Sequence, residues 1–218
     1  MRKSAVVAVA LAAVVALGGC GAQPEAQAQN EPRVDIEQSD PGASVQGEME
    51  KKEAPTITPE MQAYLDEKPW EKIKPMISVA AESSKLIKKL GYDGIVDHSA
   101  GDAMADKTLE YFVDIQALSD LTEDQVPPEL WEAHRYMTES MGAITMCSFN
   151  MGDAADAAAD RDESAYRNKL KEAKTAAEDC VKLWHGFISK MEEATGMSEA
   201  ELAQIGISKD AMKPVTGE

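Results

Sequence analysis

The chain has 218 residues and a formal charge of −17, from 39 Asp and Glu against 22 Lys and Arg. This length suggests one or two domains, large enough to bury a hydrophobic core, and three cysteines are too few for a disulfide-dense scaffold. Such acidity argues against nucleic acid as a partner, because a nucleic-acid-binding protein presents a basic face.

Residues 1–20 have the form of a bacterial export signal. Two basic residues precede an uncharged apolar run over residues 5–17. This run is shorter than the ~20 residues that span a membrane, and it matches the core of a secretory signal. It ends in Leu17-Gly18-Gly19-Cys20, which resembles the lipobox of bacterial lipoproteins, where small residues precede a cysteine.

The lipobox resemblance covers these first 20 residues only. It implies a signal peptide over residues 1–19, cleavage before Cys20, and a diacylglycerol attached to the Cys20 thiol. The mature chain would then be anchored in the lipid bilayer, on the extracytoplasmic face of the cell membrane. Two alternatives are an ordinary signal peptide with an incidental cysteine and an uncleaved membrane anchor.

Residues 20–57 comprise this cysteine and a segment rich in Gln, Glu, Ala, Pro and Gly. The segment holds too few large apolar side chains to offset the entropy lost on ordering. We therefore expect a disordered acidic linker with a reach on the order of 35 Å. The predicted folded domain covers residues 58–218, where 17 Lys and Arg stand against 31 Asp and Glu, so most of the negative charge belongs to this domain.

Helix signals begin at Thr58, an N-cap residue followed by proline at the first helical position. Hydrophobic periodicity predicts helices over residues 59–68, 76–90 and 102–121. Leu109, Phe112, Val113 and Ile115 supply the apolar faces of the third. The sequence Thr122-Glu123-Asp124-Gln125 then has the form of a capping box leading into the next helix start.

The clearest pattern lies further along the domain, where two seams of residues alternate spacings of four and three. The first seam comprises Leu130, His134, Met137, Met141, Ile144, Ser148, Met151, Ala155 and Ala158. The second seam comprises Tyr166, Leu170, Ala173, Ala177, Cys180, Trp184, Phe187, Met191 and Ala194. Each is a continuous heptad seam, and the polar residues between them predict an antiparallel helical hairpin with its tip near Asp162.

Together these elements predict an all-α fold, an up-down four-helix bundle with short extra helices at 59–68 and 198–205. The second short helix begins with another capping-box sequence, Ser198-Glu199-Ala200-Glu201. No run with the alternation of a β-strand is long enough to predict a sheet.

Pairing the two seams across the hairpin also predicts a disulfide. It places Ile144 opposite Cys180, so that Cys147 is offset by only a few Å along the axis at ~1.5 Å per residue. Since a disulfide needs Cα atoms within ~7 Å and Cys20 is assigned to the lipid, we predict a Cys147–Cys180 bond. Two buried free thiols are the alternative.

A second set of candidates could bind a metal or haem. His134, Met137 and Met141 lie on the first seam, and Met191 lies on the second, opposite His134 in the predicted pairing. Thioether and imidazole ligands suit Cu(I), and a His/Met pair can ligate haem. Methionine also fills irregular helix interfaces, and the sequence has no Cys-x-x-Cys-His motif, so our primary expectation is core packing with no cofactor.

The remaining residues of types that are common in active sites match neither a catalytic triad nor a calcium-binding loop. Asp97-His98-Ser99 holds the residue types of a hydrolase triad, but neighbours in sequence cannot face one another as a triad requires. The acids between residues 153 and 163 fail the calcium-loop template, with Ala165 and Lys171 where Gly and Glu are needed. We therefore expect no catalytic residues and no enzyme.

Interaction through the surface is the remaining class. Lys85, Lys88 and Lys89 form a small basic cluster, and Trp70 and Trp131 lie near helix starts, where each could anchor a partner or cap the core. The sequence thus predicts a cell-envelope lipoprotein that acts as a non-enzymatic binding or structural module, with an envelope protein or polymer as partner. The alternative is a helical bundle that binds a small ligand, metal or haem through the Met/His seam.

Overall fold

The computed structural model describes residues 55–216. Cys20, the expected export signal and most of the expected linker lie outside the described residues. Within residues 55–216 the chain forms helices joined by short turns, with no strand, so the predicted all-α fold is confirmed. No helix of this described part is both long enough and apolar enough to cross a membrane.

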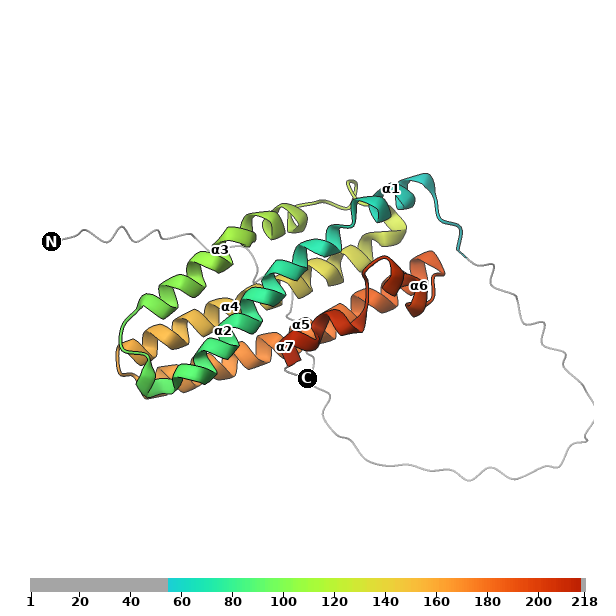
Figure 1. Ribbon diagram of the computed structural model, residues 1–218. Helices are drawn as coiled ribbons and strands as arrows, with labels where there is room; N and C mark the ends of the chain where they lie inside the picture. The colour runs from blue at the N-terminus through green and yellow to red at the C-terminus, as the bar shows by residue number, and fades with distance from the viewer. Residues whose placement is uncertain (1–54, 217–218) are drawn as a thin grey trace, which may run out of the picture. The chain divides into compact units, whose positions relative to one another are not determined.

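The described helices follow one another with short connections (Figure 1). Their bounds are α1 Pro59–Glu67, α2 Ile73–Gly94, α3 Ser99–Ser119, α4 Trp131–Ala159, α5 Glu163–Thr195, α6 Glu199–Gln204 and α7 Lys213–Thr216. Short 3-10 turns at Pro69–Lys72, Pro128–Leu130 and Lys209–Met212 precede α2, α4 and α7. Every predicted helix is present, with ends that differ by a few residues.

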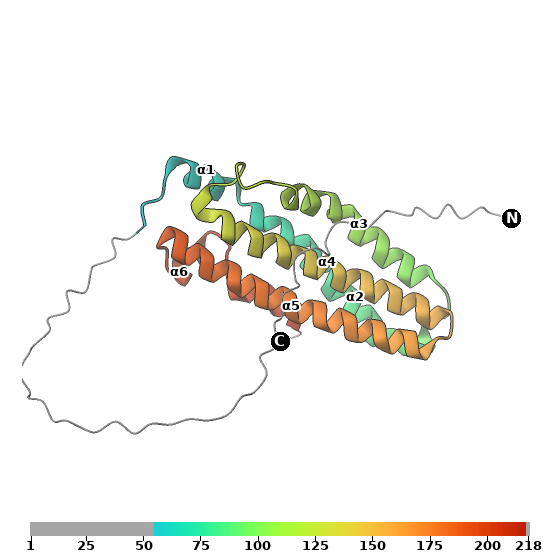
Figure 2. The same cartoon turned by 180° about the vertical axis from the view of Figure 1, so that it is seen from behind.

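The four long helices α2 to α5 run up and down along a common direction, each antiparallel to the one before it (Figure 1 and Figure 2). α4 is the central helix, because it packs most extensively on α5 and also packs on α3 and α2. Near the end of the described chain, α7 contacts both α2 and α5. The hydrophobic core therefore gathers around α4.

Several helix ends are formed by the capping residues that the sequence indicates. The Thr58 hydroxyl accepts from the backbone N–H of Met61 at 3.2 Å and caps α1, and Ser198 and Glu201 form the complete capping box of α6. Such caps supply acceptors for N–H groups that no carbonyl within the helix reaches. Gly91 interrupts α2 with φ 61° and ψ −178°, a conformation readily open only to glycine.

The capping-box sequence before α4 forms a turn instead of a helix start. The Gln125 side chain accepts from the backbone N–H of Thr122 at 2.9 Å, as in a capping box, but α4 begins only at Trp131 after a 3-10 turn. Two prolines follow this sequence, and a residue before proline is disfavoured in the helical region. The helix is therefore delayed until the prolines have been passed.

α4 and α5 form the predicted antiparallel hairpin, and most residues of both seams are buried between them. The Ser140 hydroxyl donates to the carbonyl of Cys180 at 2.9 Å, and Lys190 pairs with Glu132 at 2.8 Å. These pairs shift the two helices by about three residues from the predicted register. The shift arises because the connecting turn is centred nearer Arg161, which adopts a positive φ of 62°, than Asp162.

The segment after α6 is the part of the core that sequence analysis misses. Ile207 and Met212 are 0% and 1% exposed. The indole N–H of Trp184 donates to the carbonyl of Ser208 at 2.8 Å, and that of Trp70 donates to the carbonyl of Ile205 at 3.2 Å. Two buried tryptophans thus hold a segment that is too short to show a periodicity of its own.

Candidate functional site

The outer side of α3 and the adjoining side of α4 carry apolar side chains that the protein leaves exposed. Val113 and Leu109 on α3 are 71% and 49% exposed, and Met146 on α4 is 43% exposed. Phe112 and Phe149, both half-buried, meet edge to face across the two helices with ring centroids 6.5 Å apart. We call these five residues the α3–α4 face. Exposed apolar groups that gather in this way mark interaction surfaces.

An acidic stripe runs along α3 beside this face. Its members, spaced four residues apart and all exposed, are Asp102, Asp106, Glu110 and Asp114. Like charges at this spacing repel one another along a helix. The one lysine of α3, Lys107, pairs instead with Glu82 of α2 at 2.8 Å. Among residues 55–216, no cation lies within ion-pair distance of a member of the stripe, although the charges of Lys107 and Glu110, and of His98 and Asp102, attract each other at longer range.

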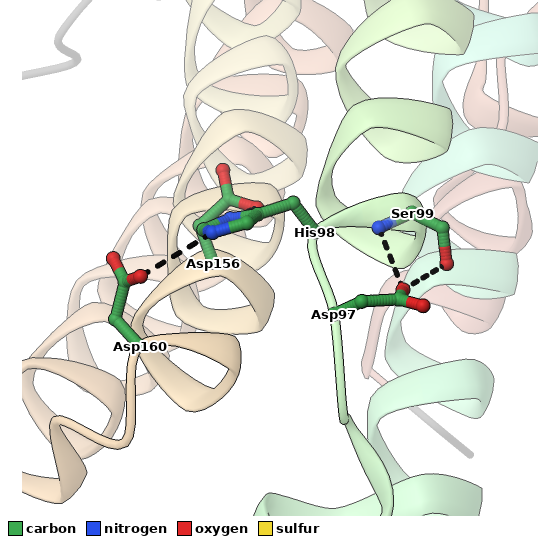
Figure 3. Close-up of polar contacts among 5 residues, drawn as sticks. All are labelled: Asp97, His98, Ser99, Asp156 and Asp160. Atoms are coloured by element: carbon green, nitrogen blue, oxygen red, sulfur yellow. Dashed lines mark hydrogen bonds and ion pairs between the residues drawn. The ribbon is translucent and has the colours of Figure 1, made fainter.

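His98 lies in the turn between α2 and α3, and its ring points to the C-terminal end of α4 (Figure 3). Its Nδ1 is 3.1 Å from Oδ1 of Asp156, and its Nε2 is 3.3 Å from Oδ1 of Asp160. Both ring nitrogens can donate at once only in the protonated form. The bond to Asp156 is the main cause that raises the pKa of His98, and the charges of Asp160 and Asp102 add to it. The contact between this turn and α4 is therefore strongest when His98 is charged.

Asp97 takes no part in this contact. Its carboxylate accepts from the backbone N–H of Ser99 at 3.0 Å and from the Ser99 hydroxyl, and these bonds hold the pKa of Asp97 below its usual value. Figure 3 shows the ring of His98 turned away from both residues. The three neighbours form a helix start and an interhelical contact, with no triad among them.

His134 is buried inside the bundle, where it joins three helices. Its Nε2 lies 3.0 Å from the carbonyl of Leu118 in α3 and donates to it. Its Nδ1 therefore accepts from the hydroxyl of Tyr64 in α1, at 2.9 Å, and Trp131 stacks on the ring with centroids 5.8 Å apart. Burial lowers the pKa of His134 and raises that of Tyr64, so both side chains are stabilised in their neutral forms.

The methionines that could join His134 in a metal or haem site have the geometry of core packing. Met137, Met141 and Met191 are each 0% exposed within one hydrophobic cluster. Ligation by His134 would require the loss of one of its two hydrogen bonds. Within residues 55–216, no three or more His, Cys, Asp or Glu side chains gather where they could hold a metal ion.

Cys147 and Cys180 are both buried free thiols in the structure. The Sγ of Cys180 lies 3.3 Å from Oγ of Ser140 and 3.8 Å from Sδ of Met212. Ser140 is thus the residue opposite Cys180, and Cys147 is two helical turns further along α4, ~10 Å at ~1.5 Å per residue. This axial offset exceeds the ~7 Å Cα separation that a disulfide allows, and both thiols are free in the structure; the Cys147–Cys180 disulfide stays a prediction. Burial raises the pKa of Cys147 to about 12 and that of Cys180 to about 11.

The remaining candidates have structural or surface positions. Trp70 is fully buried and Trp131 is half-buried, so both serve the core. Lys85, Lys88 and Lys89 are exposed on α2.

Acids at the hairpin tip support nearby helix ends. Asp162 caps α5 by accepting from the backbone N–H of Ala165 at 2.9 Å, and Asp153 pairs with Lys169 at 3.1 Å.

The described part of the chain has two surface hollows, and the second of them reaches the acidic stripe at Asp114. One, of about 160 Å³, is lined by Glu129, Glu132, Ala133, Lys190, Glu193 and Ala194. The other, of about 350 Å³, includes Lys68, Glu71, Lys72, Tyr111 and Asp114 in its lining. Small-molecule sites are typically enclosed and mostly apolar with a few placed polar groups, whereas these linings are largely exposed charges.

The apolar pattern of α3 identifies its large side chains but not which of them are exposed. It treats Leu109, Val113 and Ile115 alike as apolar faces, whereas only Ile115, at 2% exposed, packs in the core. The distinguishing signal is helical spacing, because Ile115 shares a side of α3 with buried Met104 while Leu109 and Val113 lie on another. No protein-family model, curated protein or solved structure matches the chain.

Proposed function

We propose that this chain is a lipid-anchored lipoprotein of the bacterial cell envelope, whose helical domain is a non-enzymatic binding module on the extracytoplasmic side of the membrane. The observation that carries the proposal is the α3–α4 face. Three of the five large apolar side chains that the described domain exposes, those of Leu109, Val113 and Met146, belong to it.

The anchor is supported by the lipobox resemblance at residues 17–20 and by the polar segment that separates Cys20 from the domain. The charge of the domain supports it too. A domain with 17 Lys and Arg against 31 Asp and Glu is repelled by an anionic membrane surface. Attachment at a membrane therefore requires a lipid, and two acyl chains supply enough buried CH₂ groups for stable anchoring.

A binding role fits the described domain better than catalysis or metal binding. Catalysis calls for titratable groups that converge in a cleft. In residues 55–216 the buried pair Tyr64 and His134 is satisfied internally, and the hollows are lined by surface charges. No specific observation favours the alternative of a metal, haem or small-ligand bundle.

The anchor is tested by fractionating cells that express Cys20→Ala, with Cys147→Ala as a matched cysteine control. We expect wild type and Cys147→Ala to sediment with membranes and Cys20→Ala to move to the soluble extracytoplasmic fraction. Membrane association that persists in Cys20→Ala would contradict the lipid anchor.

The binding role is tested by placing a photo-crosslinking amino acid at Val113 in intact cells, with Val96 as control. Val96 is also 71% exposed, but it lies in the turn between α2 and α3. We expect a discrete crosslinked product from position 113 and none from position 96. Equal crosslinking from the two positions would show that the α3–α4 face has no special partner.

A further inference from the structure

We infer that the α3–α4 face docks a cationic amphipathic helix of a partner protein. This inference rests on the proposed binding role and names the chemistry of the partner. Its apolar anchors would meet the exposed side chains of the face, and its Lys or Arg side chains would meet the acidic stripe.

The apolar part of the face suits a helix laid along the line where α3 meets α4. Leu109 and Val113 lie one turn apart on α3, and Met146 and Phe149 lie three residues apart on α4, so each helix presents a pair of neighbouring side chains. Phe112 of α3 and Phe149 of α4 connect the two pairs through their edge-to-face contact. A third helix with apolar residues at i, i+3, i+4 and i+7 matches such a surface.

The acidic residues at the edges of the face indicate that the partner carries positive charge. Asp106 and Glu110 precede Leu109 and Val113 by three residues, so they border the face on α3. They repel each other and make no ion pair within residues 55–216, although Lys107, which pairs with Glu82, also attracts Glu110. A cationic partner would relieve this repulsion while its apolar side covers the exposed side chains.

On α4, Glu139 and Asp153 lie seven residues before and after Met146, and both are exposed. A heptad spacing returns to nearly the same side of a helix, so acids bracket the apolar centre along α4 as well. Their present partners are Arg135 at 3.5 Å and Lys169 at 3.1 Å. Such exposed pairs are weak, and a docked cation can compete for these carboxylates.

The same charges disfavour two other occupants. An anionic lipid surface is repelled by the stripe and by the acidic domain as a whole. A second copy of this chain would bring its own acidic stripe to the same interface, where like charges oppose association. A partner helix with Lys or Arg beside its apolar anchors meets neither obstacle.

The test measures fluorescence anisotropy of a dye-labelled 18-residue helical peptide made of Leu and Lys, with Leu on one side. Two matched probes are a Leu/Glu peptide of the same pattern and a Leu/Lys peptide of scrambled order. The protein is the full chain carrying Cys20→Ala. We expect the patterned Leu/Lys peptide to bind at least tenfold more tightly than either matched probe, with affinity that falls as salt rises.

The decisive comparison is between Val113→Glu and Val96→Glu. Both add one negative charge at a side chain that is 71% exposed, so general attraction of a cationic peptide would rise slightly and equally in both. Docking on the α3–α4 face predicts that Val113→Glu weakens binding at least tenfold and that Val96→Glu does not weaken it. Circular dichroism verifies that both variants are folded.

A second pair of variants isolates the charges. Asp106→Asn with Glu110→Gln should weaken binding several-fold and reduce its salt dependence, whereas Glu123→Gln with Asp179→Asn should change neither. Equal binding of patterned and scrambled peptides, or equal responses of the two valine variants, would overturn the inference. Self-association of the chain that Val113→Glu abolishes would also overturn it, in favour of a second copy. The peptide assay does not use the lipid, so its failure leaves the fractionation result standing, and a failed fractionation leaves the docking result standing.

Discussion

At the scale of single residues, two histidines link stability to pH in opposite directions. His98 gains carboxylate partners on folding, and its pKa is raised. The stability that this contact adds to the folded state is fully present below the unfolded pKa of ~6.5. It is lost as the pH rises through the higher pKa that His98 has in the folded state. His134 is buried and neutral, and its pKa is lowered. It therefore opposes folding increasingly as the pH falls below ~6.5.

Replacing His98 with Gln should remove the first of these effects. Gln cannot carry the charge that lets both ring nitrogens donate to Asp156 and Asp160. We expect the loss in unfolding free energy to be greatest below about pH 6.5 and to shrink as the pH rises above the folded pKa. Urea titrations from pH 5.5 to 9 measure it. His185→Gln, at an exposed position of α5, should keep the wild-type profile, and a pH-independent difference for His98→Gln would contradict the charged contact.

Replacing Tyr64 with Phe tests the buried link between α1 and α4. The variant keeps the ring but removes the hydroxyl that donates to Nδ1 of His134, which leaves a buried acceptor unpaired. Such a loss costs about 1–3 kcal/mol, measured as a lower urea midpoint with an unchanged slope. Tyr111→Phe, at a half-buried ring, is the control and should change the unfolding free energy by less than about 0.5 kcal/mol.

At the scale of helices, sequence patterns predict which residues are buried better than they predict which residues meet. The two heptad seams correctly place Met141, Ile144 and Phe187 in the core, because burial follows from the periodicity of one helix alone. The register between α4 and α5 is set by the connecting turn and by contacts such as that of Ser140 with Cys180, which periodicity does not contain. A shift of about three residues leaves the same side chains buried but increases the offset between Cys147 and Cys180 along the hairpin axis.

The observed register predicts that Cys147 and Cys180 are free thiols in the native protein. We expect denaturation with an alkylating reagent, and no reductant, to add two alkyl groups at Cys147 and Cys180. In the native state both should react slowly, because they are buried and their pKa values are raised to about 12 and about 11. Alkylation that appears only after reduction would instead establish the disulfide that the seam pairing predicts.

Replacing either of two glycines in the hairpin with alanine should change the unfolding free energy in opposite directions. A Cβ at Gly186 would lie 2.6 Å from the ring of Tyr136, whereas a Cβ at Gly142 would have nothing within 4 Å. Gly186→Ala should therefore separate α4 and α5 locally and cost about 1–3 kcal/mol. Gly142→Ala should stabilise by about 0.5–1 kcal/mol, because alanine is the better helix former. Thermal unfolding compares them, and equal shifts would show that Tyr136 moves aside freely.

At the scale of the whole molecule, two features resist prediction from sequence for the same reason. Leu109 and Ile115 are alike as apolar residues of one helix, and only the position of α4 and α2 decides which is covered. Ile207 and Met212 lie in a segment without periodicity, and the indoles of Trp70 and Trp184 decide that it is buried. Whether a segment forms a helix depends on its own residues. Whether its side chains are exposed or buried depends on elements that are distant in sequence.

Removal of the residues after Gly206 should therefore destabilise the whole domain. A chain that ends after Gly206 loses the burial of Ile207 and Met212 and leaves the Trp184 indole N–H without its carbonyl. Burying two such side chains stabilises by roughly 3–6 kcal/mol, a large part of the 5–15 kcal/mol typical of a domain. Urea unfolding measures the loss, and removal of residues 217–218 alone is the control.

The thiols give this truncation a local readout as well. Met212 lies against Cys180, with its Sδ 3.8 Å from the thiol, whereas Cys147 lies on α4, seven residues beyond the Ser140 that contacts Cys180. In the chain that ends after Gly206, native-state alkylation should accelerate at Cys180 much more than at Cys147. Equal acceleration at both sites would indicate global unfolding, and an unchanged rate at Cys180 would show that the segment does not close the core.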